Sequence, residues 1–229
     1  MIKKINYFLQ AFLIYLFFLI GRILGIKISR KVFAFLFSFF GPFIKSKKIV
    51  NNNLQIFLKK NSKFKKDEII NNMWKNYGMT FIEYIFLDFF LKKKTEVEII
   101  GEINLTNIIR ENNPVIFISG HFANFELMSM EIAKRNISLA TIYRPLNNNF
   151  LNPFMEYLRK KYICKNQIKK GINGVKEAIE FIKQKHSIAL MIDQRVSEGE
   201  KIKFFDQPAL TTTLPAQFAK KYRMKIIPV

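Results

Sequence analysis

Residues 115–145 have the sequence VIFISGHFANFELMSMEIAKRNISLATIYRP, in which the hydrophobic pattern changes twice. The apolar run at 115–119 has the length of a buried strand, and apolar side chains then recur at helical spacing over 125–134. A second apolar run follows at 139–143. Alternation of this kind predicts an α/β fold, in which helices flank a mainly parallel central sheet.

The alternation continues toward the end of the chain. We expect a further short strand at 201–205, helices at 151–162, 175–185 and 213–222, and strands at 188–192 and 225–229. Residues 96–229 are therefore predicted to form one α/β domain. The chain stops inside the last of these strands, so we expect the domain to be C-terminally incomplete.

The first 45 residues contain two apolar runs bordered by basic residues. Lys3 and Lys4 precede the run from Ile5 to Ile20, and the second run extends from Val32 to Ile44. Basic flanks around apolar runs are typical of a membrane anchor, and no small-x-small cleavage site of a signal peptide follows. We interpret residues 1–45 as an N-terminal hydrophobic membrane-anchor helix, with the second run in or on the interface. In the alternative, both runs are core helices of a soluble domain.

Basic character extends over the whole chain. Residues 46–95 are predicted to be a basic helical region, in which Trp74, Tyr77 and Phe81 recur at the spacing of a packing face. The 229 residues carry a formal net charge of +21. Such a charge fits nucleic acid, an anionic membrane surface or a general compositional bias toward lysine. It therefore supports an acidic partner without naming one.

Cys164 is the only cysteine of the chain. An intramolecular disulfide and a cysteine-based zinc site are therefore excluded, and we expect the thiol to be packed rather than reactive. The sequence predicts no metal and no cofactor. A single cysteine is also compatible with a reducing location that faces the cytoplasm.

Polar residues follow three of the predicted strands. The strand at 115–119 leads into His121, the strand at 139–143 into Arg144, and the strand at 188–192 into Asp193 and Gln194. Ligands of open α/β sheets collect outside the carboxyl ends of the strands. We therefore expect these side chains to surround one site.

His121 and Glu126 are the main candidates for chemistry. Five residues along one helix would place them about 140° apart, but they can meet if His121 ends a strand and Glu126 lies in the first turn of the following helix, with Asn124 as its N-cap. A carboxylate beside an imidazole orients it and stabilises its protonated form. His121 could then act as general base on an alcohol that attacks a thioester directly. On spacing alone, a structural histidine remains the alternative, and the other histidine, His186, is interpreted as a turn residue.

The stretch from Gly120 to Glu126 resembles the His-x4-Asp/Glu motif of the lysophospholipid acyltransferase superfamily. More narrowly, it is similar to that of the lipid A biosynthesis late acyltransferases, the lauroyl and myristoyl transferases, although Phe125 stands where they commonly have Trp. Two further blocks of this family resemble Tyr143–Asn148 and Met191–Gln194, and a third is similar to segments within 204–213. Four motifs in the same order make the resemblance specific.

The resemblance implies transfer of a fatty acyl chain from acyl carrier protein, or from acyl-CoA, to a hydroxyl of a lipid A precursor in lipopolysaccharide biosynthesis. His121 would be the general base and Glu126 its partner. The expected substrate-binding residues are Arg144, Asn124, Asp193, Gln194 and Thr211. The expected location is the bacterial inner membrane, with the catalytic domain facing the cytoplasm. There, the acidic carrier protein and the anionic inner leaflet would both suit the basic surface.

Two alternatives remain open at this point. The chain could be a glycerolipid or other lysolipid acyltransferase of the same superfamily, or a basic membrane- or nucleic-acid-binding protein. No nucleic-acid-binding motif occurs in the sequence, and an anchor argues against such a role. We therefore predict no nucleic-acid partner.

Overall fold

The computed structural model describes residues 2–44, 46–59, 61, 63–92 and 97–229, which fall into two compact units. The larger unit is drawn from Met1–Ala11, Leu87–Ile202 and Pro208–Val229, and the smaller unit from Phe12–Phe86 and Lys203–Gln207. The predicted division at residues 45 and 95 does not coincide with these units and remains a prediction about domain organisation.

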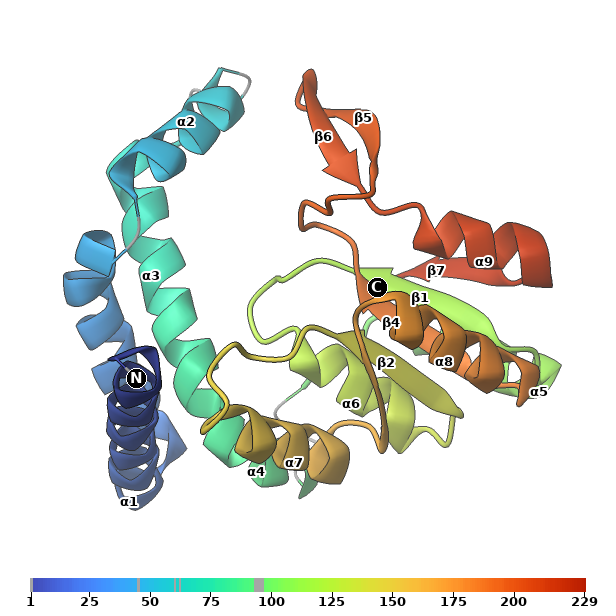
Figure 1. Cartoon of the computed structure of the whole chain (residues 1–229), viewed down its shortest axis with the longest axis horizontal. Coiled ribbons are helices and arrows are strands. Elements are labelled where there is room, and N and C mark those ends of the chain that lie inside the picture. The colour runs from blue at the N-terminus through green and yellow to red at the C-terminus, as the bar shows by residue number, and fades with distance from the viewer. Residues whose placement is uncertain (1, 45, 60, 62, 93–96) are drawn as a thin grey trace. The chain divides into compact units, whose positions relative to one another are not determined.

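Five parallel strands form the central sheet of the larger unit, in the order β3-β2-β4-β1-β7 (Figure 1). The strands are β1 (Val115–Ser119), β2 (Leu139–Tyr143), β3 (Asn166–Lys169), β4 (Ser187–Met191) and β7 (Lys225–Pro228). The predicted α/β fold with a mainly parallel sheet is therefore confirmed. The strand β3 was not predicted, because its sequence, NQIK, is mostly polar. Of its four residues only Ile168 is buried, so it lacks the apolar run of the other strands.

Helices cover both faces of this sheet. On one face, Ile116 and Ile188 of the strands share a buried cluster with Ala178 of α8 and Phe218 of α9. On the other face, α6 packs on β2 and α7 packs on β3. Strands buried on both faces read as continuous apolar runs, which explains the pattern at 115–119. The helices of this unit are α4 (Leu87–Lys92), α5 (Glu102–Glu111), α6 (Glu126–Lys134), α7 (Asn152–Tyr162), α8 (Ile172–Lys183) and α9 (Leu214–Tyr222).

A separate two-stranded hairpin consists of β5 (Glu200–Phe204) and β6 (Gln207–Thr211). The short strand predicted at 201–205 thus exists, but it pairs with β6 and not with the central sheet. Phe205 and Asp206 join the two strands, and both have positive φ angles, of 50° and 59°. Two left-handed residues in succession are characteristic of the tight turns that match the twist of a hairpin.

The long helix α1 (Ile2–Ile44) belongs to the smaller unit from Phe12 onward, and it breaks sharply at Gly25, whose φ and ψ are 75° and 162°. The rings of Phe17 and Phe33 lie only 5.7 Å apart between centroids, whereas a straight helix would separate them by about 24 Å. Ser29 Oγ also donates to the carbonyl of Gly21 at 2.7 Å. The helix therefore folds back on itself. The unit also contains α2 (Lys47–Leu58), α3 (Lys66–Glu83) and the short 3-10 helix η1 (Tyr84–Phe86).

By length and composition, α1 is the one helix among the described residues that could cross a membrane. Its apolar side chains are largely exposed, since only 17% of its most apolar window is buried. The core helix of a soluble protein would bury most of these side chains. The predicted N-terminal apolar helix that could anchor the chain to a membrane is therefore present.

Candidate active site

The imidazole of His121 lies just beyond the carboxyl end of β1, where Asp193 from the loop after β4 holds it. Oδ1 of Asp193 lies 2.7 Å from Nδ1 of His121, and Oδ2 accepts the backbone N–H of His121 at 2.8 Å. Gly120 permits this approach, because a Cβ there would lie 3.3 Å from the Asp193 carboxyl carbon and 2.8 Å from the Phe122 ring. Both oxygens of one carboxylate therefore fix the position of the histidine.

These contacts also govern the charge of Asp193. Partial burial raises the pKa of this carboxyl, but the hydrogen bonds from the amide and the imidazole of His121 outweigh burial and bring the pKa below its ordinary value. Asp193 is therefore ionised at neutral pH. A carboxylate on Nδ1 favours the tautomer with its proton on that atom, which leaves Nε2 as the basic nitrogen.

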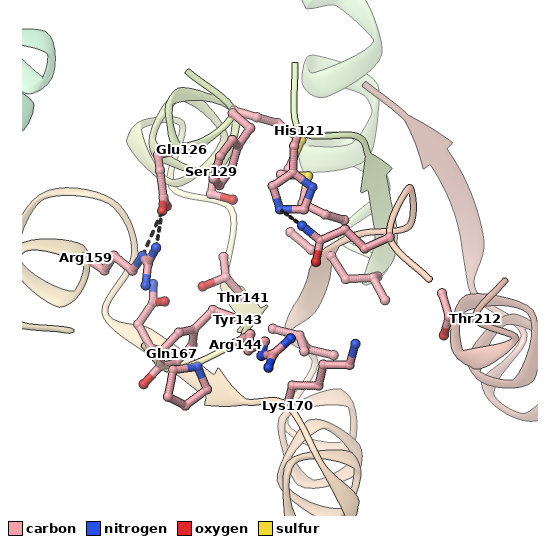
Figure 2. Close-up of a pocket in the computed structure, with 18 of the residues that line it drawn as sticks. His121, Glu126, Ser129, Thr141, Tyr143, Arg144, Arg159, Gln167, Lys170 and Thr212 are labelled. Carbon is pink, nitrogen blue, oxygen red and sulfur yellow. Dashed lines mark hydrogen bonds and ion pairs between the residues drawn. The ribbon is translucent and has the colours of Figure 1, made fainter. Parts of the chain in front are cut away.

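The Nε2 atom of His121 faces a side-chain amide and a pocket. The amide nitrogen of Gln194 lies 3.3 Å from Nε2 (Figure 2). The ring of Phe125 packs edge-on against the imidazole, with 4.5 Å between centroids. Because the His121 side chain is still 31% exposed, its basic nitrogen can be reached by a ligand.

Glu126 faces a guanidinium and not the imidazole, which corrects the expected His121–Glu126 pairing. Its Oε1 accepts from Arg159 Nε at 2.8 Å and lies 2.7 Å from Nη2, and each of the two side chains is only 10% exposed. Figure 2 shows the Glu126 carboxylate pointing toward Arg159. The carboxylate on the imidazole belongs to Asp193, and Glu126 neutralises a buried cation between α6 and α7.

The helix that carries Glu126 also begins differently from the prediction. Its N-cap residue is Phe125, without a side-chain capping bond, so the expected cap by Asn124 is wrong. Ala123, two residues before the N-cap, has a φ of 42°. This value lies in the left-handed region, which residues with a Cβ rarely adopt. The turn therefore reverses the chain through its backbone conformation, and Glu126 enters the first helical turn with its side chain buried.

A pocket of about 410 Å³ opens beside His121 at the carboxyl edge of the sheet. This volume lies within the range of small-molecule sites, about 300–1,000 Å³. Arg144 after β2 and Lys170 after β3 are exposed basic residues in its wall, and they lie across the pocket from His121 in the view of Figure 2. Apolar side chains complete the wall, among them Met128, Ile142, Leu146, Leu190 and Leu214. The pocket thus combines an imidazole, two exposed basic side chains and an apolar lining.

A second polar group supports the wall of this pocket. The carboxylate of Glu156 accepts the hydroxyl of Tyr143 at 2.6 Å and the amide of Asn152 at 2.8 Å, and lies 3.1 Å from Lys169 Nζ. The guanidinium of Arg159 lies 5.3 Å from the centre of the Tyr143 ring. These contacts link β2, β3 and α7 beneath the basic side of the pocket.

The pKa of Glu156 makes this support pH-dependent. Partial burial raises the pKa, but the hydrogen bonds from Tyr143, Asn152 and Lys169 outweigh this effect. Together they bring the pKa down to about 2. A carboxyl with a lowered folded pKa stabilises the fold above its unfolded pKa, and this contribution is lost as pH falls toward the folded value. We expect Glu156→Gln to lower the unfolding free energy at neutral pH, with a deficit that shrinks between about pH 5 and pH 2.

Urea denaturation of the parent and Glu156→Gln proteins at several pH values measures this deficit. Glu180→Gln is the matched control, because Glu180 is 62% exposed and pairs with Lys183 on the surface of α8, so its loss should change little at any pH. A Glu156→Gln deficit that stays constant as the pH falls would contradict the prediction.

The structure brings most of the predicted site residues together. His121, Glu126, Arg144 and Gln194 line the pocket, and Asp193 lies directly behind the imidazole. Asn124 and Thr211 are not part of the pocket wall, which includes Thr212 instead. The chemical roles of all these residues remain predictions.

Two basic residues of the pocket wall, Arg159 and Lys170, were not predicted from the sequence. Arg159 lies on the buried face of α7 beside Met155 and Leu158. A charged residue among apolar positions at helical spacing could have indicated that Arg159 is buried and paired. Lys170 follows β3, which was itself not recognised. The strand-end rule could therefore not be applied to Lys170.

Comparison with models of protein families gives a match over residues 2–229 to the family described as bacterial lipid A biosynthesis acyltransferase. No curated protein matches the chain at a significant level. The family match covers both compact units, and it includes every residue of the pocket.

Proposed function

The chain belongs to the bacterial lipid A biosynthesis acyltransferase family, and on this premise we propose that it transfers a fatty acyl chain from acyl carrier protein to a hydroxyl of a lipid A precursor. An acyltransferase needs an acyl donor and a lipid acceptor. We propose the carrier protein as donor because the chain, at a net charge of +21, would attract an acidic partner. We place the enzyme at the inner membrane with the larger unit facing the cytoplasm, where both substrates are accessible.

The observation that carries this proposal is the bond between Asp193 and Nδ1 of His121, with Nε2 open to a pocket. In the proposed reaction, Nε2 removes the proton of the acceptor hydroxyl while its oxygen attacks the thioester carbonyl. The tetrahedral intermediate then collapses, the carbon–sulfur bond breaks, and the imidazolium returns the proton to the leaving thiolate. The carboxylate of Asp193 stabilises the imidazolium between the two steps.

Asp193 is therefore proposed as a positioning residue in place of Glu126. We expect Asp193→Asn to lower kcat by about 10- to 100-fold, because a hydrogen bond to a charged group contributes about 1.5–3 kcal/mol. The loss should fall on kcat with little change in KM, since the interaction strengthens only when the imidazole is protonated. Steady-state kinetics at several pH values measure this, and an Asp193→Asn enzyme with the parent's kcat and pH profile would refute the role.

Arg144 is proposed to bind a phosphate of the acceptor through its guanidinium. We expect Arg144→Gln to raise the KM for the acceptor by about 10- to 100-fold with little change in kcat, as for an interaction made equally in ground and transition states. Arg195→Gln is the matched control, because Arg195 is exposed near the site but is not in the pocket wall. Equal KM values for the two variants would contradict this assignment.

A direct assay tests the proposed function as a whole. The 229-residue chain is given a labelled acyl chain on either acyl carrier protein or coenzyme A, with either a Kdo-bearing lipid A precursor or lysophosphatidic acid as acceptor. We expect product from the carrier protein and the lipid A precursor. Product on lysophosphatidic acid alone would replace this proposal with the glycerolipid alternative, and absence of product with every pair would contradict acyl transfer.

A further inference from the structure

Each half of α1 is close to the length that a helix needs to cross a bilayer. At 1.5 Å per residue, the half from Ile2 to Leu24 is about 35 Å long and the half from Ile26 to Ile44 about 28 Å, against about 30 Å of hydrocarbon. Length therefore allows a single span, a hairpin that crosses twice, or a hairpin that lies within one leaflet. The packing of α3 distinguishes among these arrangements.

The helix α3 packs closely on both halves of α1. Gly21 in the first half lies against the side chain of Ile82, and Gly41 in the second half lies against the ring of Trp74. At each glycine an added Cβ would overlap its neighbour. On α3, Gly78 in turn lies against the backbone of Phe33. Glycine permits such close approach, so α3 and the two halves form one packed group.

Two arginines near the bend of α1 are bonded to the end of α3 and to η1, which follows it. Nε of Arg30 donates to Oε1 of Glu83 at 2.6 Å, and Glu83 is only 8% exposed. Nη1 of Arg22 donates to the carbonyl of Ile85 at 3.0 Å. Separating α1 from this segment would leave a buried carboxylate without this cation, which is costly.

The composition of α3 opposes its entry into hydrocarbon. Asp67, Glu68 and Lys75 are exposed on this helix, and each charge at a bilayer centre costs about 2.5–3.5 kcal/mol even on the most permissive scale. Because α3 contacts both halves of α1, neither half can cross the membrane without α3 or without breaking the group apart.

The part of α1 that α3 leaves uncovered suits a lipid surface. Its large exposed apolar residues come from both halves, among them Phe12, Leu19, Phe35, Phe39 and Phe43, which are 59–78% exposed. Exposed lysines border this surface at the start of α1, at its bend and just after its end, namely Lys3, Lys4, Lys27, Lys31, Lys47 and Lys48. An apolar face bordered by lysines matches the hydrocarbon edge and anionic headgroups of one leaflet.

The first turns of α1 are also attached to the larger unit. Asn148, in the loop after β2, donates its side-chain amide to the carbonyl of Tyr7 at 2.8 Å. The rings of Phe8 and Phe150 meet edge to face at 5.7 Å. A span that carried the N-terminus to the far side of a bilayer would not allow these contacts.

We propose that α1 is a monotopic hairpin, which lies in one anionic leaflet and leaves its N-terminus, its bend and the larger unit on the same side of the membrane. The occupant of the exposed apolar face is therefore lipid. This arrangement is independent of the acyl-transfer chemistry, and its test does not require activity.

Cysteine labelling from each side of the membrane tests the proposal on the full-length chain. Lys4→Cys, Lys27→Cys and Lys220→Cys place one exposed thiol near the N-terminus, at the bend and on α9. A membrane-impermeant maleimide is added to Gram-negative cells with a permeabilised outer membrane, or to inverted inner-membrane vesicles. The parent chain is the background control, because its Cys164 is only 5% exposed.

We expect all three variants to sediment with membranes and to be labelled only in inverted vesicles. In the cells with a permeabilised outer membrane, labelling of Lys4→Cys alone would mean that the first half spans the bilayer, and labelling of Lys27→Cys alone would mean that the hairpin crosses twice. A chain that stays soluble as an oligomer would mean that a second copy covers the apolar face. Each of these three results would overturn the proposal.

Discussion

Replacing His121 with alanine is expected to lower acyl transfer by about 10²- to 10⁴-fold, the range over which a positioned general base contributes to a rate. The alanine removes Nε2, the only atom that the proposed reaction uses to accept the hydroxyl proton. Its structural cost should be small, because the imidazole is 31% exposed and its main partner, Asp193, is 40% exposed and can be solvated. Single-turnover rates with a labelled acyl donor measure the loss, and circular dichroism checks the fold.

His186→Ala is the matched control for this variant. His186 lies just before β4, at the amino edge of the sheet, where its ring packs against Phe181 and its Nδ1 lies 3.3 Å from the carbonyl of Gln184. The pocket lies at the opposite, carboxyl edge of the sheet. We therefore expect His186→Ala to retain the parent's rate. Equal rates for His121→Ala and His186→Ala would refute the assignment of the base.

Glu126→Gln is expected to destabilise the fold by about 3–5 kcal/mol, the usual cost of removing one partner from a buried ion pair. The Glu126 and Arg159 side chains are each 10% exposed, and glutamine cannot neutralise the guanidinium. The resulting loss of activity should follow the loss of folded protein. Denaturant unfolding at neutral pH measures the change, alongside activity per folded molecule.

Two further variants separate the structural role of Glu126 from a chemical one. Glu102→Gln removes a carboxylate that is 58% exposed and pairs with Arg135, and a surface pair of this kind contributes only about 0–1 kcal/mol. The double change of Glu126→Leu with Arg159→Met replaces both charges and should recover much of the stability. If Glu126→Gln unfolds like Glu102→Gln but has lost its rate per folded molecule, Glu126 acts in the reaction itself.

The fold could be predicted wherever the strands carry a strong apolar pattern. The runs ending at Ser119 and Tyr143 were placed correctly, because burial makes most of their residues apolar, with Thr141 as a buried exception. The strand at 166–169 has a single buried residue, so its pattern resembles that of a loop. The break in α1 was not predicted either, since an isolated Gly25 in an apolar helix gives no local sign of which backbone conformation it adopts.

The sequence predicted most of the strand-end residues that gather at the pocket, but not all of their contacts. The rule that ligands collect at the carboxyl ends of parallel strands brought His121, Arg144 and Gln194 to one pocket. Glu126 does not meet the imidazole, because its carboxylate pairs with the buried guanidinium of Arg159. Arg159 lies on another helix, 33 residues further along the chain. A contact that depends on a third, distant side chain cannot be derived from the spacing of two.

If α1 lies in one leaflet as proposed, the fold-back at Gly25 bears on how the chain would enter a membrane. A spanning anchor has to be threaded through a translocation channel during synthesis, together with any charged flank that ends on the far side. A helix that turns back within one leaflet carries no charged segment through the lipid tails. In the proposed one-leaflet arrangement, insertion would therefore need no translocation channel and could follow release from the ribosome.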